Sequence, residues 1–444
     1  MRKSILILGA GRSSASLIQY MAKTCDEFKW SLVVGDYSLQ TAVNMTRSYP
    51  LVKAIQFDIQ NKDKSSIAIN NSDIVISLLP AHFHFLVAEL CIEYKKHLIT
   101  ASYVTAEMKS LNKQAWEQDL TFLNECGLDP GIDHMSAMQL IDKIKQDGGR
   151  IDSFYSFTGG LISPNTDPQN PWRYKFTWNS RNVVMAGQST AKYLEDGAIK
   201  YIPYQQLFSR LTNVQVEGLG EFEGYANRDS LKYITAYGLD QVKTMIRGTL
   251  RSKGFCSAWN ILVQLGCCDD TFQIDNISSM THLMYTSLFV KSSNKPVKTT
   301  ISEQFNLKEE GSEIQMLEWA GLFSDELVGL SKGTPAQALE QILNKKWKLN
   351  PGDKDQIVMW HRLTYTIENS EHEIHASLIS TGENSFHTAM AKTVGLPMGI
   401  AAKLLALDRI KSRGVLIPTS PEFYVPILNE LSSLGIVLKE NSIK

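Results

Sequence analysis

A glycine-rich turn between an apolar strand and a helix constrains the fold of this chain most strongly. Residues 4–8 read Ser-Ile-Leu-Ile-Leu, an unalternating apolar run that is typical of a parallel strand covered on both faces. Gly9-Ala-Gly11-Arg-Ser-Ser14 follows, and an amphipathic helix is predicted from there to about Lys23. Gly9 suits the tight turn, Gly11 lets the backbone approach a pyrophosphate, and Ser14 is small enough to pack where a third glycine is usual. This context predicts a dinucleotide-binding domain.

Strands and helices alternate from residue 4 to about residue 140, which predicts a doubly wound parallel sheet. In such a sheet the ligand lies at the carboxyl ends of the strands. The further strands predicted in this region are 31–34, 55–58, 73–80, 97–102 and 120–123.

An acid, Asp36, closes the second predicted strand. An acid at that position hydrogen-bonds the adenine ribose hydroxyls, and its charge would repel a 2′-phosphate, so the sequence predicts NAD rather than NADP. Arg12 and Arg47 are the residues that could favour NADP instead, and a plain turn aspartate is the structural alternative. Asp58, at the end of the third predicted strand, is expected near the adenine.

The stretch from Asn124 to Met135 crowds Asp129, Asp133, His134, Pro130 and two glycines into one turn. An apolar strand precedes it and a run with helical spacing follows it, so we expect a strand-to-helix elbow. Glycine and proline suit a tight loop whose amides face a ligand. An ordinary turn with Asp133 as the helix cap is the alternative. A cap needs only one acid, which favours a functional site.

The second half of the chain has a different pattern. Residues 151–157 alternate as a half-covered antiparallel strand does, 269–350 have helical character, and 355–368 with 371–381 form a predicted hairpin. A helix over 388–407, interrupted at 395–399, is expected to return to the first domain. The predicted fold class is α/β, with a Rossmann-like dinucleotide-binding domain and an α+β substrate domain that has a mixed sheet and a helical insert. The predicted domains are 1–134 plus 388–444 for the dinucleotide, 135–268 plus 351–387 for the substrate, and 269–350 for the insert.

The composition excludes several classes of protein. The 444 residues include 45 basic and 46 acidic side chains, which argues against a nucleic-acid partner. No apolar run approaches the roughly 20 residues that span a bilayer, so we expect a cytoplasmic protein without a membrane partner. The six cysteines lack C-x-x-C spacing. His82 and His84 have no third ligand nearby, and His372 and His375 lie on opposite faces of a predicted strand, so no metal is predicted.

Three basic clusters lie in the predicted substrate domain: Arg173 with Lys175, Arg228, and Arg247 with Arg251. A single surface arginine is normally a solvated charge. Several arginines among glycine, aromatic and hydroxyl residues instead suggest a pocket for carboxylates, which a guanidinium binds in a bidentate manner. Phosphate fits this pattern equally well.

With these residues in view, the chain resembles the saccharopine reductase family, the L-glutamate-forming saccharopine dehydrogenases of lysine metabolism. The resemblance runs essentially end to end. The family interconverts saccharopine with glutamate and 2-aminoadipate 6-semialdehyde, and a homodimer is expected from it. Its most specific stretches are 76–80, 124–134, 156–161, 174–178, 227–230 and 246–251.

The resemblance implies a role for individual positions. It implies cofactor contacts at Gly9, Gly11, Arg12, Ser13, Asp58, Ile59, Leu79, Ala101, Ser102 and Asn179, and contacts with cofactor and substrate together along the elbow at Leu128, Pro130, Gly131 and Met135. It implies substrate contacts at Ser102, Tyr103, Asp129, Arg228, Thr249, Leu250 and Arg251. Saccharopine carries three carboxylates, which agrees with the arginine argument.

Asp129 is the first candidate for the acid–base group, because the elbow would place it at the nicotinamide, and His134 is the second. Either could instead only hold the substrate ammonium or cap the helix. Relatives that use NADP place an arginine near the end of the second strand, where this chain has Asp36, so the resemblance also favours NAD. Two alternatives stay open, namely a related dehydrogenase of a carboxylated polyamine and a nonenzymatic NAD-binding protein with the same fold.

Overall fold

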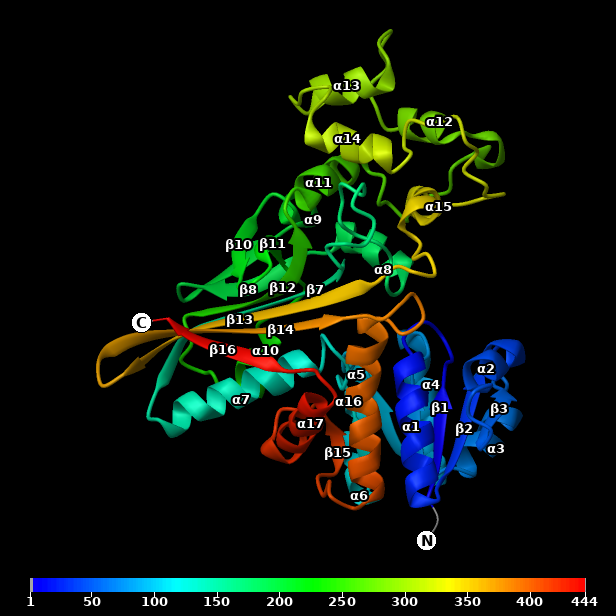
Figure 1. The fold of residues 1–444 in the computed structure, drawn as a ribbon, viewed down its shortest axis with the longest axis vertical. Coiled ribbons are helices and arrows are strands. Elements are labelled where there is room, and N and C mark those ends of the chain that lie inside the picture. Colours follow the sequence, from blue (N-terminus) through cyan, green and yellow to red (C-terminus); the bar gives the residue numbers. More distant parts are fainter. Residues whose placement is uncertain (1–2, 444) are drawn as a thin grey trace. The chain divides into compact units, whose positions relative to one another are not determined.

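The computed structural model of the protein describes residues 3–443, and the chain divides into two units (Figure 1). The first unit comprises Met1–Asp147 and Phe386–Leu438, and the second comprises Gly148–Ser385 and Lys439–Lys444. The first boundary therefore follows Asp147, whereas the sequence predicted it after residue 134. The reason is helix α7 (Ile132–Gln146), which packs in the first unit against α17 (Pro421–Ser433), where the Tyr424 hydroxyl donates to Asp142 at 2.6 Å.

Seven parallel strands form the sheet of the first unit, in the order β15-β6-β5-β4-β1-β2-β3. Six of them follow the order expected of a doubly wound dinucleotide domain. The strands are β1 (Ser4–Leu8), β2 (Ser31–Asp36), β3 (Val52–Gln56), β4 (Ile74–Ser77), β5 (His97–Thr100), β6 (Thr121–Leu123) and β15 (Gly414–Leu416).

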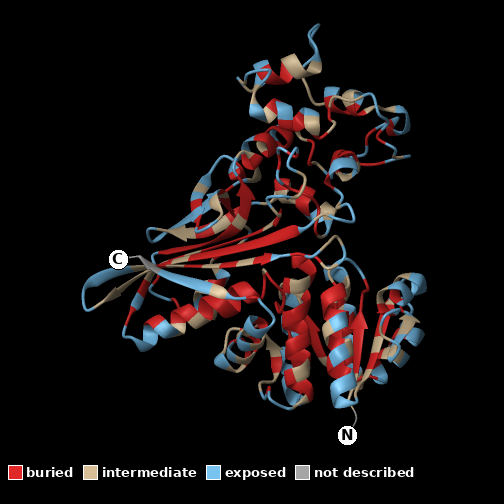
Figure 2. Ribbon diagram, in the orientation of Figure 1, coloured by how far each residue is buried: buried red, intermediate tan, exposed pale blue. Residues whose placement is uncertain are grey.

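Apolar side chains on both faces explain why the central strands are buried, as Figure 2 shows for most of β1. All four residues of β4 are buried as well. Leu6 lies between Val33 of β2 and Val75 of β4 in the register. The third strand is shifted from its predicted place at 55–58 to Val52–Gln56, so Asp58 lies beyond the strand rather than in it.

Helices cover this sheet and connect its strands. They are α1 (Ala15–Phe28), α2 (Leu39–Thr46), α3 (Lys62–Asn70), the short 3-10 helix η1 (Ala81–Phe83), α4 (His84–Tyr94), α5 (Ala106–Ser110), α6 (Asn112–Glu117), α7, α16 (Ala389–Ala406) and α17.

Helix α16 runs without the interruption predicted at 395–399, although Pro397 lies inside it. The two glycines of that stretch serve close packing, because a Cβ at Gly395 would lie 2.9 Å from the backbone nitrogen of Leu17 in α1, and one at Gly399 would lie 2.7 Å from the Tyr20 ring. By length and composition alone α16 could cross a membrane, but most of it is buried against α1, α17, β4 and β5.

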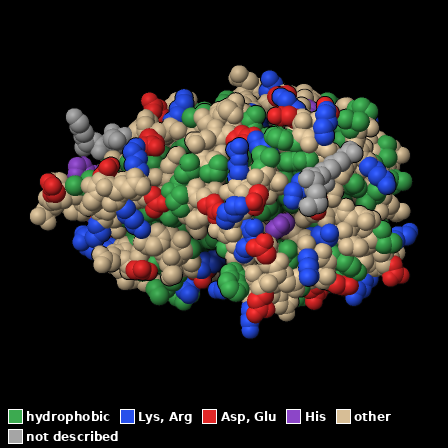
Figure 3. All heavy atoms as spheres, turned by 90° about the horizontal axis from the view of Figure 1, so that it is seen from below, with side chains coloured by type: hydrophobic (Ala, Val, Ile, Leu, Met, Phe, Trp, Pro, Cys, Tyr) green, Lys and Arg blue, Asp and Glu red, His purple; other side chains and the backbone are tan. Residues whose placement is uncertain are grey.

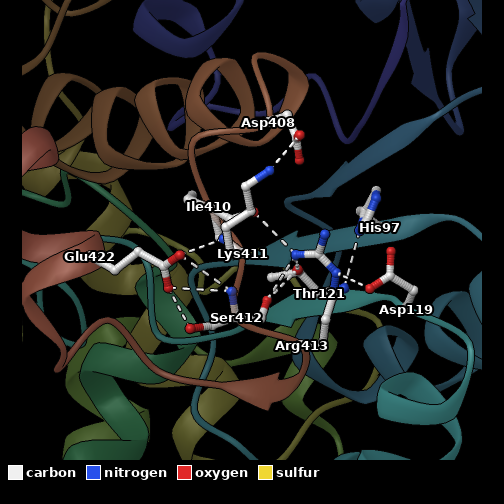
Figure 4. Close-up of polar contacts among 9 residues, drawn as sticks. All are labelled: His97, Asp119, Thr121, Asp408, Ile410, Lys411, Ser412, Arg413 and Glu422. Carbon is white, nitrogen blue, oxygen red and sulfur yellow. Dashed lines mark hydrogen bonds and ion pairs between the residues drawn. The ribbon is translucent and has the colours of Figure 1, made fainter.

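A polar cluster fastens the returning strand β15 to β6 (Figure 4). Arg413 lies 2.7 Å from Asp119 and donates to the Thr121 hydroxyl at 3.3 Å, and that hydroxyl donates to the backbone carbonyl of Ser412 at 2.7 Å. The Glu422 carboxylate accepts hydrogen bonds from the Ser412 hydroxyl and from the backbone N–H groups of Lys411 and Ser412. The chain beyond residue 386 is thereby joined to the sheet formed by the first 123 residues.

The sheet of the second unit is mixed, because β7 pairs in parallel with β12 and the other described pairs are antiparallel. Its main path is β10-β11-β12-β7-β13-β14-β16, and the β8–β9 hairpin joins it at β12. The strands are β7 (Arg150–Ile162), β8 (Ala191–Glu195), β9 (Ala198–Ile202), β10 (Leu211–Val216), β11 (Gly220–Ala226), β12 (Thr244–Ser252), β13 (Asp355–Ile367), β14 (Ser370–Thr381) and β16 (Leu438–Ile443).

Most helices of the second unit share one hydrophobic core with this sheet. Residues 269–350 are helical as predicted, yet their apolar side chains, such as Tyr285 and Leu339, join the same core as Phe157 of β7, so they are not a separate body. The helices are α8 (Ser180–Met185), η2 (Ala186–Gln188), α9 (Tyr204–Leu207), α10 (Lys232–Ala236), α11 (Phe255–Leu265), η3 (Ile277–Ser279), α12 (His282–Ser287), α13 (Val297–Gln304), α14 (Ser312–Trp319) and α15 (Pro335–Trp347).

We expect His97, which lies beside the polar cluster that joins β15 to β6, to make the protein sensitive to acid. Its Nδ1 accepts the Thr121 N–H at 3.0 Å, and burial, helped by the nearby Arg413 and Lys3, lowers the pKa of His97 to about 4. The folded chain keeps the ring neutral while the unfolded chain protonates it below about pH 6.5. Its contribution to stability is therefore complete above pH 6.5 and is lost as the pH falls toward 4, by about 3 kcal/mol at most.

The measurement is the free energy of unfolding as a function of pH. His97→Asn keeps an acceptor for the Thr121 N–H but does not titrate, so this variant should lose less stability than the natural chain between pH 6.5 and 4. His372→Asn, at an exposed position of β14, is the matched control and should follow the natural profile. An unchanged acid profile in His97→Asn contradicts the assignment.

Candidate functional site

The carboxyl edge of the first sheet collects the predicted site residues of the first unit. All seven strands run in one direction, so the loops that follow them leave from one edge. The neighbouring strands β1 and β4 form the switch point at which the strand order reverses. The loops at this edge carry Gly9, Gly11, Arg12, Ser13, Asp58, Ile59, Leu79, Ala101, Ser102, Tyr103, Leu128, Asp129, Pro130 and Gly131. Asp36 ends β2, and His134 and Met135 lie in the first turn of α7.

The turn from β1 into α1 has the geometry of a pyrophosphate cradle. Gly9 has φ +97°, and a Cβ there would lie 3.0 Å from the carbonyl oxygen of Leu78. A Cβ at Gly11 would meet nothing within 4 Å, so the backbone of that residue faces open space. The Ser14 hydroxyl donates to the Gly11 carbonyl at 2.8 Å and does not cap the helix. The first amides of α1 can therefore bind phosphate oxygens, which fits a dinucleotide.

Asp36 holds the backbone of this turn. Its Oδ2 accepts the N–H of Ala10 at 2.8 Å, and its Oδ1 accepts the N–H of Ser38 at 3.0 Å. Both carboxylate oxygens thus serve backbone amides, one in the phosphate turn and one in the turn that follows β2. The acid has a structural task that the sequence pattern did not reveal.

Two arginines were considered as partners of a 2′-phosphate, and the structure separates them. Arg12 is exposed on the phosphate turn itself. Arg47 caps the far end of α2, an eight-residue helix that is about 12 Å long. Arg12 is therefore the better placed of the two.

The elbow is built around a buried histidine. His134 is fully buried at the start of α7, where its Nε2 lies 2.9 Å from Glu125 Oε2 and its Nδ1 lies 3.6 Å from Asp133 Oδ2. Glu125 also accepts the Val104 N–H at 3.0 Å, and Asp133 accepts the Gly131 N–H at 2.6 Å. Both ring nitrogens of His134 thus face carboxylates. The cap position of α7 is Gly131, not Asp133 as the simpler interpretation had it.

Glycine is required at the centre of this elbow. Gly131 has φ +149°, and a Cβ there would lie 2.1 Å from the carbonyl oxygen of Gly127. The peptide bond before Pro130 is cis. Asp129, next to it, is only half-buried, and its Oδ1 accepts a hydrogen bond from the Tyr103 hydroxyl at 3.2 Å. The elbow therefore holds His134 inside and Asp129 at the edge of the sheet.

Sequence reasoning missed a hydrogen-bonded chain at the same edge. His84 begins α4, and its Nδ1 lies 3.0 Å from the Ser77 hydroxyl while its Nε2 lies 2.8 Å from the Ser102 hydroxyl. In the sequence this histidine stands out only as half of the His82–His84 pair, a spacing found among metal ligands. Serines at the ends of two neighbouring parallel strands were the available signal, because such ends meet at one edge.

The remaining predicted positions lie in the second unit. Arg251 of β12 is buried among three aromatic rings, with its Cζ 5.0 Å from the centre of Tyr174, 5.2 Å from Phe255 and 5.9 Å from Tyr225. Its Nη1 donates to the carbonyl of Leu250 at 2.9 Å, and no described residue partners its Nε. Burial raises the pKa of Tyr174 to about 12, so this phenol stays neutral. Among the described residues, the Arg251 guanidinium thus contacts neutral rings and a backbone carbonyl, with the Cys256 thiol nearby.

Other predicted residues of this unit have distinct surroundings. Thr249, half-buried, precedes Leu250, whose side chain is fully buried in the core. Arg228 is exposed with φ +52° in the turn after β11, and Asn179 caps α8, where its side chain accepts the N–H of Asn182.

In the basic cluster of Arg173 and Lys175, the lysine is paired with acidic side chains of the fold. Lys175 is buried between Asp167 at 2.8 Å and Asp353 at 2.7 Å, so it is a structural cation rather than part of a carboxylate pocket. On the face drawn in Figure 3, basic and acidic side chains are interspersed. Within residues 3–443, no group of three His, Cys, Asp or Glu side chains could hold a metal ion.

Two family models cover nearly the whole chain. The saccharopine dehydrogenase NADP binding domain matches residues 5–123, and the saccharopine dehydrogenase C-terminal domain matches residues 127–436. The second match alone spans more than half of the chain.

Individual relatives agree with these matches. The chain is 34% identical to the mitochondrial alpha-aminoadipic semialdehyde synthase of Bos taurus, covering 99% of this chain and 48% of the relative, so it spans about half the length of that protein. It is 32% identical to the saccharopine dehydrogenase (NADP(+), L-glutamate-forming) of Saccharomyces cerevisiae, covering 100% of both chains. The solved apo structure of the L-Glu-forming saccharopine dehydrogenase from that yeast has a TM-score of 0.90 at 30% identity over both full chains. The predicted fold class is confirmed.

The expectation of NAD is wrong. The N-terminal family model is an NADP binding domain, and the relatives from S. cerevisiae, Schizosaccharomyces pombe and Pyricularia oryzae carry NADP(+) in their names. The inference rested on Asp36 as a group that binds ribose and repels phosphate. In the structure its two oxygens instead bind the N–H groups of Ala10 and Ser38.

We expect Glu125→Gln to destabilise the first unit. The substitution replaces one of the two carboxylate oxygens that contact the Val104 N–H and the His134 ring by an NH2 group, and it removes the negative charge, inside a buried turn. The free energy of unfolding should fall by about 1–3 kcal/mol, which thermal or urea unfolding measures. The control is Glu117→Gln, which removes an exposed ion pair with Lys113 and should change stability by less than about 0.5 kcal/mol. Equal effects of the two substitutions on the free energy of unfolding would show that the buried contact of Glu125 with His134 adds no stability.

Proposed function

Because the chain belongs to the saccharopine dehydrogenase family, we propose that it interconverts saccharopine with L-glutamate and L-2-aminoadipate 6-semialdehyde, using NADP. The observation that carries this proposal is the full-length match to the yeast L-glutamate-forming enzyme in sequence and in fold. Because the synthases are matched over only about half of their length, the proposal concerns this one reaction. A cytoplasmic location and a homodimer stay predictions.

The cofactor would lie along the carboxyl edge of the first sheet. The Gly9–Ser14 turn and the first amides of α1 would hold its pyrophosphate. Arg12, exposed on that turn, would pair with the 2′-phosphate, since a guanidinium binds phosphate in a bidentate manner. The chemistry that bound NADP supplies is acceptance of a hydride from the carbon bearing the secondary amine of saccharopine, which leaves an imine for water to hydrolyse.

Asp129 is the proposed acid–base group. The secondary amine must lose a proton, water must be activated, and the departing amine must gain a proton. Asp129 is half-buried at the sheet edge with its Oδ1 oriented by the Tyr103 hydroxyl, so it can reach a ligand there. His134 is fully buried between Glu125 and Asp133, which supports a positioning role for it instead.

Arg251 would bind one of the substrate carboxylates. Its guanidinium is buried among aromatic rings, and its only described hydrogen bond goes to a carbonyl. A carboxylate would supply the missing opposite charge and would accept two parallel hydrogen bonds. Arg228 and Thr249 are the further substrate positions that the family resemblance implies.

A direct assay tests the reaction. Saccharopine should produce reduced nicotinamide with NADP at a kcat/KM at least about tenfold above that with NAD, because the relatives are NADP enzymes. Carboxylated polyamines serve as competing substrates. The proposal fails if a polyamine is preferred or if NADP binds without any turnover of saccharopine. A preference for NAD would overturn the cofactor assignment alone.

A substitution tests the acid–base assignment. Asp129→Asn keeps the size of the side chain but cannot take up a proton, so kcat should fall by about 100- to 10,000-fold while the Kd for NADP changes little. Tyr103→Phe, which removes the 3.2 Å hydrogen bond to Asp129 but leaves the carboxylate in place, is the graded control and should cost less. Near-normal turnover in Asp129→Asn, measured by stopped-flow absorbance, would exclude this carboxylate.

A further inference from the structure

A chain of two hydroxyls and one imidazole lies at the carboxyl edge of the first sheet, and the steps proposed above do not use it. Ser77 ends β4, His84 begins α4, and Ser102 follows β5. The Ser77 hydroxyl is 3.0 Å from His84 Nδ1, and the Ser102 hydroxyl is 2.8 Å from His84 Nε2. Three separate elements are needed to build this contact.

The hydrogen-bonded series Ser77–His84–Ser102 leads from the interior to the edge where the ligand would lie. Ser77 is fully buried and His84 is 5% exposed, whereas Ser102 is half-buried. The backbone of Ser102 is already engaged, since its N–H donates to the Thr100 hydroxyl at 3.2 Å and its carbonyl accepts the Glu125 N–H at 3.1 Å. Its hydroxyl is therefore the polar group that this residue can offer to a ligand.

Only one direction of the hydrogen bonds satisfies every buried hydrogen. Burial, with the neighbouring His82, lowers the pKa of His84 to about 4, so the ring is neutral near pH 7 and has a single N–H. If Nδ1 carried this single hydrogen, the Ser77 hydroxyl would have to accept the hydrogen bond from Nδ1, and the hydroxyl's own hydrogen would lack an acceptor among the described residues. If Nε2 carries it, Ser77 donates to Nδ1 and Nε2 donates to Ser102. An unsatisfied buried donor disfavours the first arrangement by roughly 5- to 150-fold.

We propose that His84 is a positioning residue that, together with Ser77, fixes the Ser102 hydroxyl as a hydrogen-bond donor to the substrate. The Ser102 oxygen receives the Nε2 hydrogen, so its own hydrogen points to the ligand. Such a group suits an acceptor, and the substrate class proposed above offers carboxylate oxygens. The inference rests on that proposed function for the ligand, but not for the direction of the hydrogen bonds.

The direction can be measured without any turnover. In full-length protein containing nitrogen-labelled histidine, the ring nitrogen chemical shifts at neutral pH distinguish a protonated from an unprotonated nitrogen. The signals of His84 are identified by their loss in His84→Gln. We expect protonated Nε2 and unprotonated Nδ1. Protonated Nδ1 overturns the proposal, and so does an imidazole that is protonated at both nitrogens.

A double-mutant cycle tests whether His84 acts through Ser102. Ser102→Ala and His84→Phe should each lower kcat/KM for saccharopine by roughly 10- to 150-fold, because a hydrogen bond to a charged group is lost or misdirected. If His84 acts only through Ser102, the double variant should be no worse than Ser102→Ala within about twofold. His84→Gln, whose amide can still donate to Ser102, should recover part of the loss. His82→Gln changes an exposed neighbour that takes no part in the hydrogen bonds of Ser77, His84 and Ser102. It is the matched control and should resemble the natural protein.

The outcomes separate this inference from the proposed function. Multiplying effects in the double variant mean that His84 acts independently of Ser102, which overturns the inference while the reaction stands. Should His84→Phe not fold, the cycle is measured with His84→Gln. Absence of saccharopine turnover in the natural protein refutes the proposed function. The nitrogen chemical shifts then decide by themselves the direction of the hydrogen bonds between Ser77, His84 and Ser102.

Discussion

A buried imidazole between two carboxylates, His134 between Glu125 and Asp133, holds the turn on which the candidate chemistry of the first unit depends. Polar groups of this kind are costly in the interior unless each has a partner, so the end of β6, the turn and the start of α7 must adopt one arrangement together. Glycine at 131 permits that arrangement because no Cβ fits against Gly127. The half-buried Asp129 is thereby placed on a rigid support rather than on a mobile loop.

Much of the fold could be predicted because its signals are local. The apolar runs at 4–8 and 97–100 and the Gly9–Ser14 turn identify a parallel dinucleotide sheet, and the alternation after residue 355 identifies a hairpin. Features that depend on a distant partner could not be predicted in this way. The glycines at 395 and 399 suggested a broken helix, and only the presence of α1 shows that they serve close packing.

The site shows the same division. That Asp36 ends β2 was readable from the sequence, but its hydrogen bonds to Ala10 and Ser38 were not, so its charge was assigned to cofactor choice when it supports a turn. His84 was likewise visible only as half of a histidine pair. Its partners, Ser77 and Ser102, are 25 residues apart in the sequence and lie at or just after the ends of two different strands, so the contact itself becomes visible only in the folded sheet. Residue type thus indicated that these polar side chains lie at the sheet edge, but it did not indicate which atoms they contact.

The division of the first unit between two distant segments has a consequence for the order of folding. Residues 389–416 supply the helix that lies against α1 and the seventh strand of the sheet, yet they are made only after residues 148–385 of the second unit. During synthesis the apolar face of α1 around Leu17 therefore lacks its partner until the 360 residues between α1 and α16 have been made, whereas residues 148–385 can complete their own core first. The cofactor cradle at the start of α1 is thus among the last parts of the molecule to acquire its final support.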